Sequence, residues 1–173
     1  EFRRVLFRSR FPLEVFDAVR AAFPKDKPVG IRLSATDWVD GGWDLEGTIA
    51  LSAELKKRGV DWIDVSSAGL SAAQKITLGP GYQVPFADAV KKATGVTTMA
   101  VGLITEAKQA EEIISSGKAD MIALARAMLY DARWPWHAAA ALGATVDAPP
   151  QYWRSQPSHL KTLFSDKRPA GMR

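Results

Sequence analysis

The sequence contains no cysteine and only two histidines among its 173 residues. The absence of cysteine excludes disulfide bonds, thiolate catalysis and cysteine-ligated metals within this chain. The two histidines, His137 and His159, have no second metal-type ligand at a useful spacing, so we expect no metal site. The sequence gives no basis for a Ser–His–Asp arrangement either.

Long apolar runs are also absent. No stretch approaches the ~18 apolar residues of a transmembrane helix. The arginine-rich N-terminus lacks the apolar core and small-residue cleavage site of a signal peptide. We therefore expect a cytoplasmic protein with no membrane partner. No Gly-x-Gly-x-x-Gly follows the first predicted strand, which argues against a Rossmann dinucleotide site.

Positive charge is concentrated at the two ends of the chain. Residues 1–10 carry a net charge of +3 and residues 154–173 carry +4, whereas residues 11–153 carry −3. Nucleic-acid binding usually requires a basic face on the domain itself, so we expect no nucleic-acid partner. We divide the chain into residues 1–7, a leader that is a linker or an artefact, a folded body over 8–148, and a tail over 149–173.

Apolar periodicity predicts helices that alternate with short strands. We expect helices over 11–23, 45–58, 86–93, 106–116 and 134–142. Strands are expected over 29–34, 61–66 and 97–101, and a strand that runs into a short helix over 119–130. A loop over 67–84 is long enough to be functional. Strict alternation of this kind predicts a parallel sheet covered by helices.

Two α/β architectures fit this order: a doubly wound open sheet, or about half of a (β/α)8 TIM barrel, because a whole barrel needs roughly 250 residues. Alternation along the strands puts aliphatic side chains on one face. The other face is polar or small, which favours the barrel interior over an open sheet that is apolar on both faces. The predicted inner residues are Gly30, Arg32, Ser34, Asp64, Ser66, Ala100, Gly102, Ala123 and Ala125.

Three strand ends carry the candidate chemistry. Arg32 lies near the end of its strand and needs an anionic partner, because a guanidinium does not lose its proton. That partner is either Asp64 on the neighbouring strand or a ligand at the carboxyl edge, where barrel active sites lie. Gly102 and the pair Ala125–Arg126 follow the next two strands. Small residues there let backbone N–H groups approach a phosphate, although they can equally serve packing.

Four motifs, in order, resemble the C-terminal half of the old yellow enzyme family. They are Val29-Gly-Ile-Arg-Leu-Ser, Pro80-Gly-Tyr-Gln-Val-Pro-Phe-Ala, Met99-Ala-Val-Gly-Leu-Ile-Thr and Ala119-Asp-Met-Ile-Ala-Leu-Ala-Arg. Within the family, the chain is most similar to the bacterial thermophilic-like ene-reductases and xenobiotic reductases. The resemblance covers about Arg8 to Arg154 and implies strands five to eight of a TIM barrel.

The resemblance also implies a function. Family members use FMN, which NAD(P)H reduces, to pass hydride to the β-carbon of an activated alkene such as an enone. By motif, Arg32 would lie beside the flavin pyrimidine ring. Gly102, Ala125 and Arg126 would hold the FMN phosphate. Arg154 resembles an arginine that reaches into a neighbouring subunit's active site, which implies a homo-oligomer.

Family members take their substrate-binding His/His or His/Asn pair, their proton-donating Tyr and a flavin-contacting Gln from the first half of the barrel. No part of this sequence resembles that first half. We therefore expect the chain alone to bind FMN weakly or not at all, and to be inactive. Two alternatives stay open: a non-catalytic half-barrel that self-associates without flavin, and another phosphate-binding FMN barrel.

Overall fold

The computed structural model describes residues 2–67 and 69–165, and the side chains of residues 7–67 and 69–164. The ends of the predicted leader and tail, residue 1 and residues 166–173, lie outside the described residues. The chain folds into two compact units. The first comprises residues 1–104 and 112–124, and the second comprises residues 105–111 and 125–173.

The first helix, α1 (Phe2–Ala22), starts nine residues earlier than the sequence pattern indicated. The amphipathic period begins only at Phe11, but residues 2–11 contain neither glycine nor proline, so nothing in them breaks a helix. Pro12 consequently lies inside the helix rather than in its first turn. There it removes one backbone hydrogen-bond donor.

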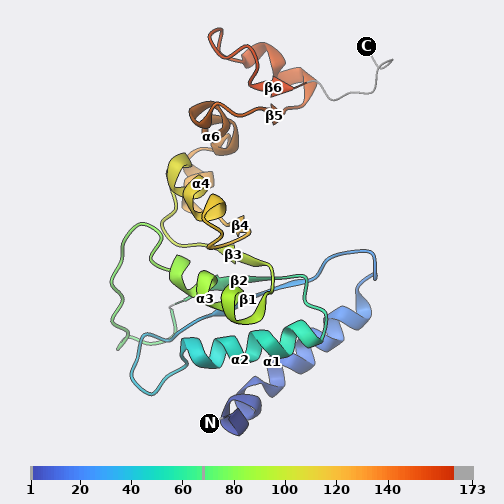
Figure 1. The fold of residues 1–173 in the computed structure, drawn as a ribbon, viewed down its shortest axis with the longest axis vertical. Helices are drawn as coiled ribbons and strands as arrows, with labels where there is room; N and C mark the ends of the chain where they lie inside the picture. Colours follow the sequence, from blue (N-terminus) through green and yellow to red (C-terminus); the bar gives the residue numbers. More distant parts are fainter. Residues whose placement is uncertain (1, 68, 166–173) are drawn as a thin grey trace. The chain divides into compact units, whose positions relative to one another are not determined.

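Four parallel strands form the sheet of the first unit, as the alternating pattern predicted (Figure 1). They are β1 (Gly30–Ser34), β2 (Trp62–Ser66), β3 (Thr98–Ala100) and β4 (Met121–Ile122). Each strand pairs with the one before it, so their order across the sheet is the order in the chain. The helices that alternate with them are α2 (Leu45–Lys57), α3 (Val84–Thr94) and α4 (Ala107–Ser115).

The register shows which side chains share a face. Arg32 pairs with Asp64, and Asp64 pairs with Met99. On the opposite face Leu33 pairs with Val65, which pairs with Ala100, and these three are buried. The prediction that Ala100 lies on the same face as Arg32 is therefore wrong. The segment Thr-Met-Ala-Val has no alternation of polar and apolar residues, so the sequence could not set the parity of β3.

Helix α2 packs against both α1 and α3 in the first unit, with α1 and α2 running alongside each other (Figure 1). Its N-terminus is capped by Asp44, whose Oδ1 accepts a hydrogen bond from Gly47 N at 2.8 Å. Helix α3 ends at Gly95, which adopts a left-handed conformation with φ +65°. The core between these elements is apolar and includes Leu13, Phe16, Leu51, Leu55, Ile63, Val65, Ala87 and Val90.

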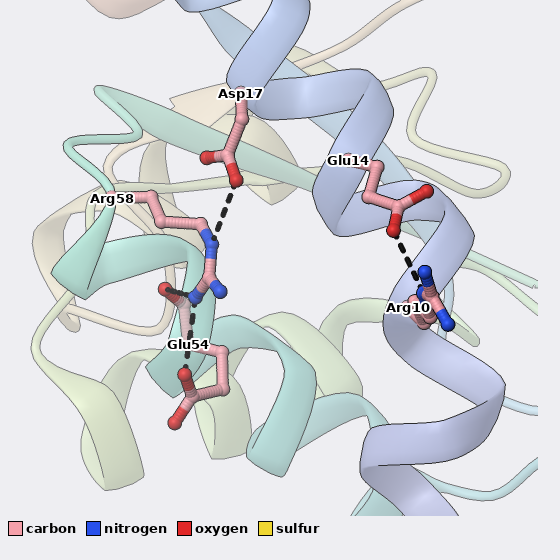
Figure 2. A network of polar contacts seen from close by, with 5 residues as sticks. All are labelled: Arg10, Glu14, Asp17, Glu54 and Arg58. Atoms are coloured by element: carbon pink, nitrogen blue, oxygen red, sulfur yellow. Dashed lines mark hydrogen bonds and ion pairs between the residues drawn. The ribbon is translucent and has the colours of Figure 1, made fainter.

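Charged side chains join α1 to α2 at the protein surface (Figure 2). Arg58, just after α2, contacts Asp17 of α1 at 3.3 Å and Glu54 Oε2 at 3.1 Å. Hydrogen bonds from Lys57 and Arg58 lower the pKa of Glu54 below its ordinary value. Within α1, Arg10 pairs with Glu14 at 2.7 Å. The pair of Arg10 and Glu14 is highly exposed, so it contributes little to stability.

Two aspartates repeat one arrangement where strands begin. Asp61 Oδ2 accepts a hydrogen bond from Val29 N at 2.6 Å, just before β1. Asp120 Oδ2 accepts from Thr98 N at 2.9 Å, at the start of β3, and its Oδ1 contacts Lys91 Nζ at 2.8 Å. Each carboxylate thus satisfies the first donor of the neighbouring strand. These contacts stabilise the sheet at the edge opposite its carboxyl ends.

The second unit contains α5 (Arg126–Tyr130), α6 (Trp134–Leu142), β5 (Val146–Asp147), η1 (Pro150–Ser155) and β6 (Phe164–Ser165). Helix α6 matches its predicted bounds. We expected no regular structure in the tail over 149–173, and this is wrong for η1 and for β6, which pairs in parallel with β5. Two-residue strands carry too little periodicity to be seen in a sequence. Within the described residues, no helix is long and apolar enough to cross a membrane.

Candidate functional site

Arg32 and Asp64 meet near the carboxyl ends of β1 and β2, where the parallel register puts them side by side. Arg32 Nε and Nη2 each lie 2.6 Å from Asp64 Oδ2. The other oxygen, Asp64 Oδ1, is buried and has no hydrogen-bond partner among the described residues. The ion pair expected as one of the two interpretations of Arg32 is therefore confirmed.

The two partners differ strongly in exposure. The side chain of Asp64 is 10% exposed, whereas that of Arg32 is 62% exposed. Within the described part of the chain, the guanidinium has no protein acceptor other than Asp64. Asp64 thus fixes the orientation of a cation whose remaining N–H groups face the surface. Such a group can bind an anion or a carbonyl oxygen with two donors at once.

Gly102 follows β3 and adopts φ +119°, a conformation that side chains of other residues rarely allow. Its carbonyl oxygen accepts a hydrogen bond from Gly81 N at 2.9 Å, so the loop before α3 is attached to this strand end. A Cβ atom at Gly102 would lie 2.7 Å from Gln83 Nε2 and 3.1 Å from Tyr82 Cε1. Glycine is therefore required here for both its φ angle and its lack of a side chain.

Sequence reasoning missed Gln83, which the structure buries at this strand end with 3% exposure. Its Oε1 accepts a hydrogen bond from Ser67 Oγ at 2.5 Å, and its Nε2 donates to Val101 O at 3.2 Å. The signal was available: Gln83 is the polar residue of the Pro80-Gly-Tyr-Gln motif, at the end of the long loop. A polar side chain beside a helix start is usually exposed, and the sequence alone could not show that this one is buried.

The long loop, residues 67–83, also contacts the loop after β1. Lys75 N donates to Trp38 O at 3.1 Å. The Trp38 ring lies 5.5 Å from that of Phe86 and 6.5 Å from that of Tyr82. Trp38 has φ +57°, an uncommon conformation for a bulky residue. The loops after β1 and β2 are thus packed together at the carboxyl edge of the sheet.

The other predicted residues belong to the second unit. Ala125 precedes α5 and Arg126 is its first residue, and both are exposed. Arg154 lies in the last turn of η1 and is exposed as well. Its neighbour Tyr152 is held by the guanidinium of Arg133, which lies 4.5 Å from the Tyr152 ring centroid. The first unit therefore brings Arg32 and Gly102 to one sheet edge, and the roles of the other three stay predictions.

A model of the NADH:flavin oxidoreductase / NADH oxidase family matches residues 6–144. The chain belongs to this family. The resemblance to the old yellow enzymes, which the four motifs indicated, is thereby confirmed. The NADPH dehydrogenase of Geobacillus sp. (strain WCH70) is 44% identical over 147 residues, which are 85% of this chain and 42% of that protein. The NADPH dehydrogenase of Listeria innocua is 42% identical over 148 residues, 86% of this chain and 43% of that protein.

Solved structures of reductases resemble the fold. Morphinone reductase superimposes with a TM-score of 0.56 at 25% identity, over 94% of this chain and 43% of that protein. A 2-naphthoyl-CoA reductase in complex with 2-naphthoyl-CoA gives a TM-score of 0.69 at 22% identity, over 79% of this chain and 21% of that chain. The second likeness concerns the fold alone. The chain spans about two fifths of the length of the curated relatives it matches.

Proposed function

We propose that the chain supplies strands five to eight of a (β/α)8 barrel that binds FMN and reduces activated C=C bonds with NAD(P)H. Membership of the NADH:flavin oxidoreductase family carries this proposal. The strand order supports the barrel half, because β1 to β4 follow one another without reversal. A doubly wound sheet reverses its order at a switch point, whereas a barrel does not.

The residues at the carboxyl edge fit a flavin. Arg32 offers outward-facing donors on a cation that Asp64 holds in place. The negatively charged form of the isoalloxazine pyrimidine ring is a hydrogen-bond acceptor. The outward-facing N–H groups of Arg32 can donate to such an acceptor. Gly102 has no side chain of its own that could stand between its backbone N–H and an approaching phosphate. Both features come from the geometry of the first unit and agree with the roles that the resemblance implies.

FMN, when bound, supplies the transfer of hydride from NAD(P)H to the β-carbon of an activated alkene such as an enone. The chain's contribution is electrostatic and positional. Arg32 stabilises negative charge on the pyrimidine ring, and a preorganised cation does this without reorganising as the charge develops. Gly102 provides a backbone donor to the phosphate. Ala125 and Arg126 are proposed for the same phosphate on the resemblance alone.

The substrate-binding pair and the proton-donating Tyr of this family come from the first half of its barrel. This chain matches only about two fifths of its relatives' length. We therefore propose that the catalytic cycle needs residues from the rest of that length, and that this chain alone is inactive. Arg154 is proposed to reach the active site of a neighbouring subunit, which requires a homo-oligomer. Cytoplasmic location stays a prediction from the sequence.

A chimera tests the flavin assignment. Residues 8–154 replace the segment of the Geobacillus NADPH dehydrogenase that they match. We expect the purified chimera to retain FMN and to oxidise NADPH when an enone is added. The Arg32→Met chimera should hold FMN less tightly and show a more negative flavin reduction potential. A folded chimera that retains no FMN would refute the proposal, and an unchanged potential would refute the role of Arg32.

One observation favours a second candidate, a self-associating half-barrel without flavin. Four exposed apolar side chains recur every four residues along α1 and just beyond its end, namely Phe11, Val15 and Val19 of α1 and Phe23 after it. Such a stripe on an otherwise polar helix surface is typical of an interaction site. Light scattering on the purified chain would favour this candidate if stable dimers form and added FMN stays unbound.

A further inference from the structure

The amide side chain of Gln83 joins two strand ends. Its oxygen accepts from Ser67 Oγ after β2, and its nitrogen donates to Val101 O after β3. Both ends of the amide are therefore occupied, and the side chain is almost fully buried. A buried amide bonded at both ends has one orientation, because either rotation would leave polar atoms unpaired. Gln83 is thus a rigid link between these strand ends.

This link fixes the direction of one backbone donor. A peptide group is planar and trans, so its C=O and N–H point in opposite directions. Since Val101 O points at Gln83 Nε2, the N–H of Gly102 in the same peptide group points away from Gln83. No acceptor for Gly102 N is present within the described part of the chain. A half-buried donor with a fixed direction is available to a ligand.

The same residue explains why position 102 must be glycine. The Gln83 nitrogen approaches so closely that a Cβ atom would lie 2.7 Å away. The backbone also adopts φ +119° at this position, and the next residue, Leu103, has φ +50°. Consecutive positive φ angles turn the chain sharply at the strand end. Gly81 N donates a hydrogen bond to Gly102 O, which attaches this turn to the loop before α3.

We propose that Gln83 is a positioning residue for phosphate binding: it aims the Gly102 N–H at the anionic phosphate of the cofactor. Gln83 does not touch the phosphate itself. It acts through the Val101–Gly102 peptide group, and Ser67 acts through Gln83. This inference rests on the proposed FMN function and adds the residue that sets the donor's direction.

The first experiment follows the Gly102 amide signal of the full 173-residue chain, labelled with ¹⁵N, as inorganic phosphate is added. In the wild type, phosphate should shift this signal progressively. Gln83→Met should reduce the apparent phosphate affinity at Gly102 by about tenfold, the effect of losing one well-aligned charged hydrogen bond. Gln83→Glu keeps the acceptor for Ser67 but loses the donor to Val101, so it should behave like Gln83→Met.

Gln74→Met is the matched control. Gln74 belongs to the same loop, and its Oε1 accepts from Gly69 N at 3.0 Å. Among the described residues it makes no hydrogen bond to Val101 or Gly102, so its replacement should leave the phosphate response unchanged. Dispersed amide spectra establish that each variant is folded. If Gln83→Met fails to fold, Gln83→Glu and Ser67→Ala provide the comparison.

Titration with FMN and with riboflavin, which lacks the phosphate, separates positioning from general stability. In the chimera that contains residues 8–154, Gln83→Glu should weaken FMN binding about tenfold more than riboflavin binding, measured by flavin fluorescence. Equal weakening of both ligands would overturn the inference and make Gln83 a purely structural residue. A Gly102 signal that phosphate leaves unmoved in the wild type would also overturn it. If the chimera nevertheless retains FMN, only this inference fails, whereas a chimera without FMN defeats the proposed function.

Discussion

At the scale of the residue, the pair formed by Arg32 and Asp64 combines structure with binding. Asp64 is nearly buried and has one oxygen without a partner. Burying a carboxylate is costly unless it is paired, so Arg32 stabilises the fold as well as presenting donors. A structural effect and a ligand effect of an Arg32 substitution must therefore be measured separately.

A double-mutant cycle separates them. Arg32→Met leaves the Asp64 carboxylate without its partner and should lower the free energy of unfolding by about 1–2 kcal/mol, since water replaces part of the lost hydrogen bonds. Asp64→Leu removes the buried charge, and the double variant should recover about 1 kcal/mol relative to the sum of the single variants. Urea unfolding measures all four proteins. Strict additivity would show that the pair does not stabilise the fold.

We expect Asp120 to make the stability of the fold depend on pH. Burial by itself raises the pKa of this carboxyl, but hydrogen bonds from Lys91 and from Thr98 N outweigh it, so the pKa is below its ordinary value of 3.8. A carboxylate with a lowered pKa stabilises the folded state above its unfolded pKa, and this contribution is lost as the pH falls through the folded pKa.

Asp120→Asn should therefore lower stability at neutral pH by about 1 kcal/mol. It should also flatten the decline in stability below about pH 4. Thermal unfolding across acidic pH measures both effects. Lys91→Met removes one of the two hydrogen bonds and should give an intermediate slope. A wild-type slope in Asp120→Asn would contradict this role for Asp120.

At the scale of the element, the N-terminus of α2 depends on one cap. Asp44 Oδ1 accepts from Gly47 N, a donor that has no partner within the helix. Asp44→Ala should destabilise the protein by about 1 kcal/mol. Asp40→Ala is the matched control, because Asp40 is exposed in the same loop and forms no hydrogen bond or ion pair with the described residues. Chemical unfolding that shows equal effects for the two variants would exclude a capping role.

The sequence predicted the elements that have strong periods or clear stops. Helix α6 has its predicted bounds, and α2 ends at Lys57, one residue before its predicted end and two residues before Gly59. The parallel order of the strands followed from their alternation with helices. The parity of β3 did not follow, because Met99 and Ala100 differ too little in polarity to mark two faces. The pairing of β5 with β6 depends on long-range contacts that no local pattern contains.

The candidate site was also predictable in part from the sequence. Arg32 and Gly102 stand out as unusual residues at strand ends, and the register brings Arg32 to the partner that the sequence suggested. The exposure of Arg32 was not predictable, since it depends on what lies over the sheet edge. Gln83 was missed because its importance comes from burial, which is a property of the folded loop.

At the scale of the whole molecule, the chain pairs four strands in one parallel sheet and spans about two fifths of its curated relatives. In the described structure, β1 and β4 each pair with only one other strand. Unpaired edges of this kind readily accept another strand. We therefore expect the complementary part of a relative's barrel to associate with this chain.

Co-expression tests this central claim most directly. The chain is purified alone and together with the remaining part of the Geobacillus NADPH dehydrogenase, and bound FMN is measured by visible absorbance before and after NADPH is added. We predict little FMN on the chain alone and a stoichiometric, NADPH-reducible flavin on the complex. A tightly bound, reducible flavin on the chain alone, or a stable complex without flavin, would contradict it.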